Sequence, residues 1–172
     1  FLWVGTIIAK ESICIQPDIR GDEIVFIQGG NLWYGRIEQN HVRATPLLKD
    51  NGSISYPKFS KNGERIAFVG KVDFLPNWDL FSVALNGDNL ERHTYTGIES
   101  SPCSWLGDRK IAYQTYSNHI SREKTLALVH LDNPNSKEST LGVEQSAEPC
   151  ITPNGDLFFV RFSPQSVISS YR

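Results

Sequence analysis

The histidines are the first residues to consider for acid–base or metal chemistry, because imidazole changes charge near neutral pH and binds metals. None of them lies at the spacing of a zinc-binding H-E-x-x-H motif. No G-x-S-x-G elbow presents a serine nucleophile, and no phosphate loop or dinucleotide fingerprint occurs. We therefore expect no catalytic, metal-binding or cofactor-binding residue in this segment, and no cofactor. The predicted positions are outer, solvated strands for His41 and His93, a loop for His119 and a strand end for His130.

The cysteines are Cys14, Cys103 and Cys150. An odd and low number does not make a disulfide framework, and the absence of a C-x-x-C pair argues against a zinc knuckle. Cysteine otherwise behaves as a small hydrophobic residue in the interior. We expect three reduced, buried thiols, with Cys103 and Cys150 at equivalent positions because each follows a proline.

Acidic residues that could act as general acids or bases are scattered along the chain. Hairpin turns and solvent-facing positions explain them more simply than catalysis does. The residues concerned are Asp22, Glu23, Asp73, Asp79 and Asp88.

The segment "GKVDFLPNW" at residues 70–78 is the stretch that best fits a contact site. It is longer than the corresponding turn near residue 29 and carries three large apolar side chains, Phe74, Leu75 and Trp78. An apolar loop at the surface often touches a partner or a substrate. The alternative is that Trp78 packs inward and the loop only covers the strands below it.

A repeat organises the strands that carry these residues. Each unit begins with a proline and a short apolar stretch, passes a glycine turn and continues into an alternating strand. The prolines are Pro17, Pro57, Pro102 and Pro149, and the glycines are Gly21, Gly63, Gly107 and Gly155. Successive prolines are 40, 45 and 47 residues apart. In two units the turn is Asn-Gly, which favours a tight hairpin because both residues accept positive φ.

Each unit continues into two more predicted strands. Third strands are expected at 31–38, 78–85 and 124–131, and fourth strands at 41–48, 89–95 and 137–143. Four strands in 40–47 residues without helical periodicity are typical of β-propeller blades. The sequence thus predicts an all-β propeller of four-stranded antiparallel blades, with about three and a half blades in this chain.

The predicted propeller occupies residues 16–172, with blades near 16–52, 53–98, 99–145 and 146–172. Because a blade lies between two neighbours, both faces of its middle strands are covered. This explains the adjacent rings of Trp33 and Tyr34, which point to opposite faces of one strand and are expected to lie in the core between blades.

Composition limits the partners. Net charge is −2 and no basic stripe is interleaved with aromatic residues, so nucleic acid is not an expected partner. The chain has no methionine, which indicates a processed form or an excerpt. Residues 1–9 are apolar but too few to span a membrane. If they end a secretory signal the protein is periplasmic or exported, and if residues 1–15 provide a leading strand it is cytoplasmic.

Two stretches carry a family resemblance. "YPKFSKNGERIAFVG" followed by "DLFSVALNGDNLERHTY" resembles the repeat of TolB-like propellers. "QPDIRGDEIVFIQGGNLWYGRI" at 16–37 is similar to the opening of the tricorn protease family, with Asn31 in place of the usual Asp before Leu-Trp. The C-terminal "SVISSYR" also fits the point where that family continues into its next stretch.

The tricorn resemblance implies the first half of an N-terminal six-bladed propeller, ahead of a seven-bladed propeller, a PDZ-like domain and serine-peptidase lobes. The segment would then be a non-catalytic channel wall or gate for oligopeptides, its partners being peptides or other domains of its own chain, in a homo-oligomeric parent. Two alternatives remain open. One is a TolB-like module for protein interaction, and the other is a propeller attached to a different hydrolase.

Overall fold

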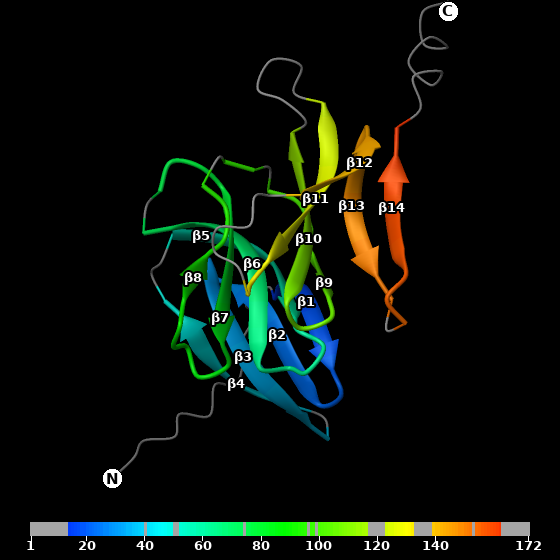
Figure 1. Ribbon diagram of the computed structural model, residues 1–172. Coiled ribbons are helices and arrows are strands. Elements are labelled where there is room, and N and C mark those ends of the chain that lie inside the picture. Colours follow the sequence, from blue (N-terminus) through cyan, green and yellow to red (C-terminus); the bar gives the residue numbers. More distant parts are fainter. Residues whose placement is uncertain are drawn as a thin grey trace, which may run out of the picture.

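The computed structural model describes residues 14–39, 41–49, 52–73, 75–95, 97–98, 100–116, 123–132, 139–152 and 154–162. Within these ranges all regular structure is strand, in four antiparallel sheets (Figure 1). Sheet one contains β1 (Ile15–Arg20), β2 (Glu23–Gln28), β3 (Asn31–Glu38) and β4 (His41–Leu48). Sheet two contains β5 (Gly52–Phe59), β6 (Arg65–Val72), β7 (Asp79–Ala84) and β8 (Glu91–Arg92). Sheet three contains β9 (Ser104–Leu106), β10 (Lys110–Tyr116), β11 (Lys124–His130) and β12 (Ser139–Glu144). Sheet four contains β13 (Ser146–Ile151) and β14 (Leu157–Arg161).

In every sheet the strands pair in chain order, as in β1-β2-β3-β4. Figure 1 shows the sheets following one another from the blue sheet at the bottom to the orange pair at the upper right. The successive sheets are arranged along an arc. The first strands of neighbouring sheets contact one another, so they form the inner side of this arc. The predicted fold class, a partial β-propeller of four-stranded antiparallel blades, is confirmed.

The repeat proline lies at a β-bulge in three of the four sheets. Pairing of the first strand shifts register there, and the residue just before the proline has positive φ: Gln16 (52°), Tyr56 (54°) and Glu148 (54°). A bulge leaves one residue out of the hydrogen-bond ladder, so a proline without an N–H fits there. In sheet three the paired strand begins after Pro102, at Ser104.

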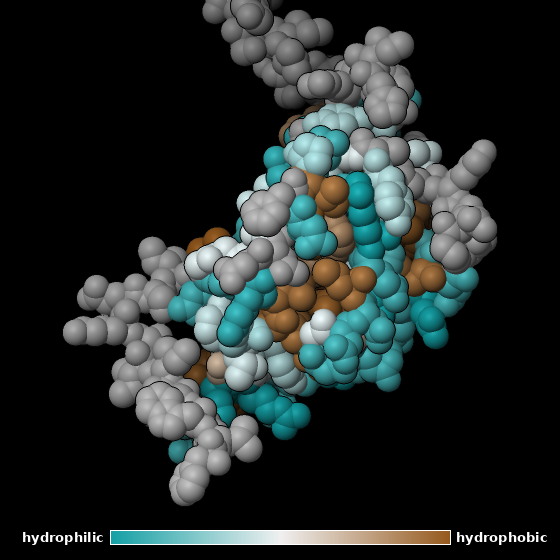
Figure 2. Space-filling model, turned by 90° about the vertical axis from the view of Figure 1, so that its left-hand side faces the viewer, coloured by the Kyte–Doolittle hydropathy of each residue, from teal (hydrophilic) through white to brown (hydrophobic). Residues whose placement is uncertain are grey.

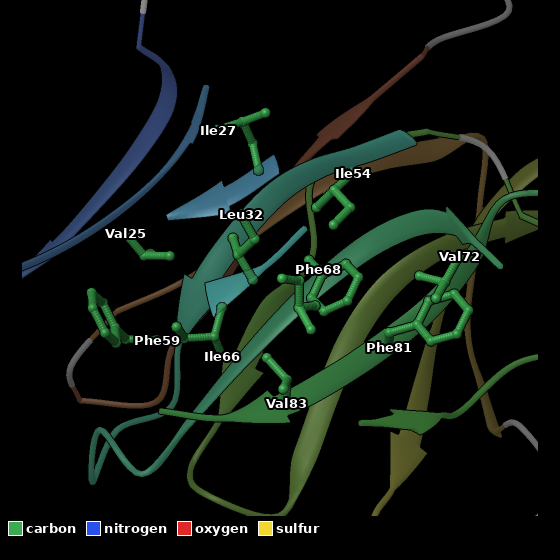
Figure 3. Packing of buried hydrophobic residues seen from close by; sticks show 11 residues of the cluster. Val25, Ile27, Leu32, Ile54, Phe59, Ile66, Phe68, Val72, Phe81 and Val83 are labelled. Carbon is green, nitrogen blue, oxygen red and sulfur yellow. The ribbon is translucent and has the colours of Figure 1, made fainter. Parts of the chain in front are cut away.

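The largest described core lies between sheets one and two. Figure 3 shows its side chains pointing toward one another from both sheets. Phe68 and Phe81, on adjacent strands, stack with centroids 5.6 Å apart. The cluster comprises Val25, Ile27, Leu32, Leu48, Ile54, Phe59, Ile66, Phe68, Val72, Phe81 and Val83. A second core joins the other face of sheet two to sheet three and includes Leu80, Trp105 and Tyr113. Sheet two is therefore covered on both faces, as a blade requires.

Trp33 and Tyr34 have different surroundings. Tyr34 packs on the core between sheets one and two, edge-on to Phe59 at 6.3 Å. Trp33 stacks on Phe26 of its own sheet, and its Nε1 donates to the Gln28 carbonyl at 3.2 Å. The expected burial between two blades is met for Tyr34 only, because no described sheet covers the face that carries Trp33.

The fourth strand of sheet two is shorter than predicted, with two residues instead of seven. Residues 1–9, which carry the prediction of a signal remnant or a leading strand, lie outside the described residues.

Candidate functional site

The inner side of the arc is a seam of hydrogen bonds between the first strands. Asp18 of β1 accepts two bonds from β5, one from Lys58 Nζ at 2.9 Å and one from the Phe59 backbone N–H at 2.9 Å. Gln16 Oε1 accepts from the Tyr56 backbone N–H at 2.8 Å. Because an open strand edge would pair with another chain, these side chains remove a template for strand addition.

The same pattern continues along the arc. Trp105 Nε1 donates to the Lys58 carbonyl at 2.9 Å, and the Ile151 N–H donates to Ser104 Oγ at 3.0 Å. Side-chain bonds thus connect the first strands from sheet to sheet and satisfy the backbone groups of Tyr56, Lys58, Phe59 and Ile151.

The turns at one end of the sheets also interlock. Arg20 Nη2 donates to the Asn62 carbonyl at 2.7 Å, and the Asn62 N–H donates to Asp108 Oδ1 at 2.6 Å. Beside these turns, between sheets two and three, lies a cavity of about 390 Å³. It is lined by Asn62, Glu64, Arg65, Ala84, Glu91, Asp108, Arg109 and Leu131. The lining contains both acidic and basic side chains, and Arg65 Nη2 lies 3.3 Å from Glu91 Oε2.

A buried polar cluster adjoins this cavity. The Ser82 hydroxyl is fully buried and lies 2.8 Å from His93 Nε2. Arg65 donates to the same oxygen from Nε at 3.1 Å and from Nη2 at 2.8 Å. Burial, together with the smaller effect of the Arg65 charge, lowers the pKa of His93 to about 4. Sequence reasoning missed this cluster and placed His93 on a solvated strand. This is wrong, because His93 lies opposite Leu80, to whose carbonyl its N–H donates, and its side chain therefore lies on the face of sheet two that is turned toward sheet three.

Asp79 is another polar residue for which the sequence prediction was wrong. Its side chain is 0% exposed, and it accepts from Arg92 Nη2 at 2.7 Å and from Thr94 Oγ1 at 2.9 Å. Thr94 Oγ1 in turn accepts from the Leu80 N–H at 2.9 Å. These bonds attach the outer segment of sheet two where regular pairing has ended. Glu23 is also buried, bonded to Tyr34 and Arg20, whereas Asp73 and Asp88 lie in turns as expected.

The apolar loop at 70–78 is anchored on sheet two. Leu75 is half-buried against the core between sheets one and two, and Trp78 is half-buried against the core between sheets two and three. Lys71 Nζ lies 5.7 Å from the centroid of the Trp78 ring. The Ile98 N–H donates to the Trp78 carbonyl at 2.8 Å. Phe74 lies outside the described residues, and a partner or substrate contact of this loop stays a prediction.

The remaining candidates are spread out. His41 is exposed on β4 and His130 ends β11, both as predicted, and His119 lies outside the described residues. Among the described residues no group of three or more His, Cys, Asp and Glu could hold a metal ion. In the same part of the chain no helix is long and apolar enough to cross a membrane.

Burial was predicted correctly for one cysteine and wrongly for two. Cys103 is a free thiol, fully buried against sheet two with Sγ 3.7 Å from the Tyr56 carbonyl, and burial raises its pKa to about 12. Cys150 is a free thiol but exposed, and Cys14 is exposed too. Cys150 pairs with Phe158, which is 62% exposed, so both lie on a face that no described sheet covers.

Two apolar sheet faces are open to solvent at the ends of the arc. On sheet one the register places Ile19, Phe26, Trp33 and Val42 on the face away from sheet two, and Ile19 is 59% exposed. On sheet four the exposed large hydrophobic residues are Phe158 and Val160 on one face of β14, Phe159 on the other face, and Phe162 just beyond the strand. Figure 2, which draws one face of the molecule, also shows hydrophobic side chains gathered between hydrophilic ones.

A sequence model of the tricorn protease N-terminal β-propeller domain matches residues 11–171. Among curated proteins no significant match is found.

Solved structures of propellers are similar in fold. A crystal structure of the tricorn protease is 17% identical, with a TM-score of 0.54, over 83% of this chain and 14% of that chain. A putative TolB from Agrobacterium tumefaciens is 17% identical, with a TM-score of 0.65, over 90% of this chain and 59% of that one. The propeller domain of the Trilobed protease from Pyrococcus furiosus is 12% identical, with a TM-score of 0.55, over 86% and 53%. The chain thus spans less than two thirds of each of these proteins.

Proposed function

The chain belongs to the family of tricorn protease N-terminal β-propeller domains, and on this basis we propose that it is part of the first propeller of a tricorn-like serine peptidase. The observation that carries the proposal is the family match along residues 11–171. In this proposal residues 16–172 supply successive blades of one ring. Further strands of the parent chain would complete sheet four and cover the two open apolar faces, which otherwise favour association.

The segment would act as a non-catalytic wall or gate for oligopeptides. The bonds along the inner seam support this role, because strand-edge groups that are already bonded offer a passing peptide fewer partners for strand addition. The partly exposed pair of Lys58 and Asp18 is the charged feature of that seam. The parent would be a homo-oligomer whose own domains, along with peptides, are the partners of this segment.

The test uses the complete parent protein and two long peptides of equal length, one rich in lysine and one rich in glutamate. Lys58→Gln removes a positive charge from the inner seam and leaves Asp18 uncompensated. We expect the ratio of kcat/KM for the lysine-rich over the glutamate-rich peptide to rise by about threefold or more, since local charge steers charged ligands. Reaction with a small serine-directed reagent should not change. Lys49→Gln is the matched control, because Lys49 is exposed beyond the end of the outer strand β4.

An unchanged ratio in Lys58→Gln would contradict the wall function. A complete protein that folds but cleaves no peptide would contradict the peptidase assignment. That second result would favour a TolB-like interaction module, which the similarity to the Agrobacterium TolB supports.

A further inference from the structure

The hydroxyl of Ser82 fixes the protonation state of His93. A hydroxyl has two acceptor lone pairs and one hydrogen to donate. Two N–H groups of Arg65 point at Ser82 Oγ, at 3.1 and 2.8 Å, and fill both lone pairs. The hydroxyl hydrogen must then go to His93 Nε2, 2.8 Å away. His93 is therefore the neutral tautomer with its proton on Nδ1. A proton on Nε2 would face an oxygen with no free lone pair and a guanidinium bonded to that oxygen.

On the face toward sheet three, this arrangement helps to attach the outer segment of sheet two. Two residue pairs join β8 to β7 among the described residues, Phe81 with Arg92 and Ser82 with Glu91, and the His93 N–H adds one more backbone bond, to the Leu80 carbonyl at 2.8 Å. Arg65 holds the segment from the side of sheet three, because its Nη2 donates to the Asn89 carbonyl at 2.9 Å and pairs with Glu91 at 3.3 Å. The guanidinium that holds residues 89–91 is thus the one that a protonated His93 would repel.

The charges around His93 give little compensation for a second cation. From β6 it faces Arg65, and on its own segment Glu91 is already paired with Arg65. From sheet three, Asp108 and Arg109 line the neighbouring cavity. Glu64, next to Arg65, lines it too, and its carboxylate accepts from Asn62 Nδ2 at 2.8 Å. Asp108 is bonded to the Asn62 N–H, and Arg109 is paired with Asp132 at 2.8 Å. The ion pair of Asp79 and Arg92 lies on the face of sheet two that is turned toward sheet one. Arg92 pairs with Phe81 across the strands, and Phe81 belongs to the core between sheets one and two.

We propose that His93 is a proton-operated latch: its protonation releases residues 89–95 from sheet two and opens the cavity between sheets two and three. The neutral ring closes the latch through Ser82, and the cationic ring opposes Arg65 and frees Glu91 at the cavity rim. The inference does not depend on the proposed peptidase function, since it concerns one blade alone.

The experiment is hydrogen–deuterium exchange of the complete protein at pH 7.5 and pH 5.0, corrected for intrinsic exchange rates. With a pKa near 4 in the closed state and 6.5 in the open state, acidification should raise the opening of residues 89–95 by roughly 25-fold. His93→Gln keeps an acceptor for the Ser82 hydroxyl but cannot be protonated. We expect this variant to match the wild type at pH 7.5 and to lose the pH effect. His41→Gln, which removes an exposed histidine from β4, is the matched control and should keep the effect.

Three results would overturn the latch. The first is a wild-type segment whose corrected exchange does not change between the two pH values. The second is the same pH effect in His93→Gln as in the wild type. The third is an equal rise in exchange of β6 and β7, because this would be a loss of stability of the whole sheet instead of the release of its outer segment.

Discussion

Asp79 provides the sharpest test of how the outer segment of sheet two is attached. The carboxylate is completely buried, with Arg92 Nη2 at 2.7 Å and Thr94 Oγ1 at 2.9 Å. Asp79→Ala removes the acceptor for both donors and leaves a small cavity. Removing one partner of a buried ion pair usually costs about 3–5 kcal/mol. The Arg92 side chain is 26% exposed and can still reach water, so we expect the lower end, about 3 kcal/mol.

Asp79→Asn removes the negative charge but keeps an oxygen that can accept hydrogen bonds, so it measures the contribution of the charge. The amide oxygen can still accept from Thr94, so the loss is mainly the charged bond to Arg92, about 1.5–3 kcal/mol. The matched control is Asp132→Asn, which breaks a pair with Arg109 of nearly the same length, 2.8 Å, in which both side chains are more than 60% exposed. An exposed pair contributes about 0–1 kcal/mol.

The assay is native-state hydrogen exchange of the complete protein, which gives the free energy of opening for β7 and for residues 89–95. We expect the order Asp79→Ala, Asp79→Asn, Asp132→Asn from the most to the least destabilised. If Asp79→Asn and Asp132→Asn had equal effects, burial would not set the strength of the pair, and the attachment of the outer segment would have to be explained by backbone pairing.

Three further predictions concern pH, turn geometry and thiol reactivity. Folding lowers the pKa of His93, so the unfolded chain binds more protons than the folded chain between pH 6.5 and about 4. The free energy of unfolding should therefore be at its full value above pH 6.5 and fall by about 3 kcal/mol as the pH drops to 4. Denaturant titrations at several pH values measure it, and a free energy that stayed constant would contradict the prediction. Gly63→Ala and Gly107→Ala both place a side chain at positive φ, 78° and 71°, at a cost of about 1–2 kcal/mol. Gly63→Ala should cost about 1 kcal/mol more in thermal or urea unfolding, because its Cβ would overlap the Arg20 guanidinium, and equal costs would show that Arg20 moves away freely. Because its pKa is near 12, Cys103 should react with iodoacetamide at pH 8 about 1,000-fold more slowly than an ordinary thiol. Mass spectrometry of the alkylated protein measures this rate, and rapid alkylation in the folded state would contradict the burial of Cys103.

Repetition made the fold readable from the sequence. The prolines and turn glycines recur at blade spacing, and the alternating pattern between them favours strands. The structure also explains the proline, which lies at a bulge next to a residue of positive φ in three of the four first strands. The sequence did not predict where the outer strand of sheet two ends, because beyond Arg92 the described residues of the outer segment keep a single backbone bond to β7, from the His93 N–H to the Leu80 carbonyl, and side-chain bonds from Asp79 and Arg65 hold the rest of the segment.

The buried polar residues were the part that residue types alone could not place. Glu23 in sheet one and Arg65 in sheet two occupy equivalent positions, each as the first residue of the second strand. Tyr34 and Ser82 are likewise equivalent positions in the third strands of the two sheets. Glu23 accepts from the Tyr34 hydroxyl at 2.5 Å, and Arg65 donates to the Ser82 hydroxyl at 2.8 Å.

The same two positions, diagonal to each other on adjacent strands, therefore hold a bonded polar pair in both sheets. The charged member is negative in sheet one and positive in sheet two, and no residue type is the same. A motif search at fixed spacing finds neither pair, since no residue type is shared between them. What the two sheets share is a physical requirement. A charged group buried between blades needs a hydrogen-bonded partner, and in both sheets a side chain of the third strand provides one. In sheet two that partner, Ser82, has one hydrogen left to give, and His93 accepts it.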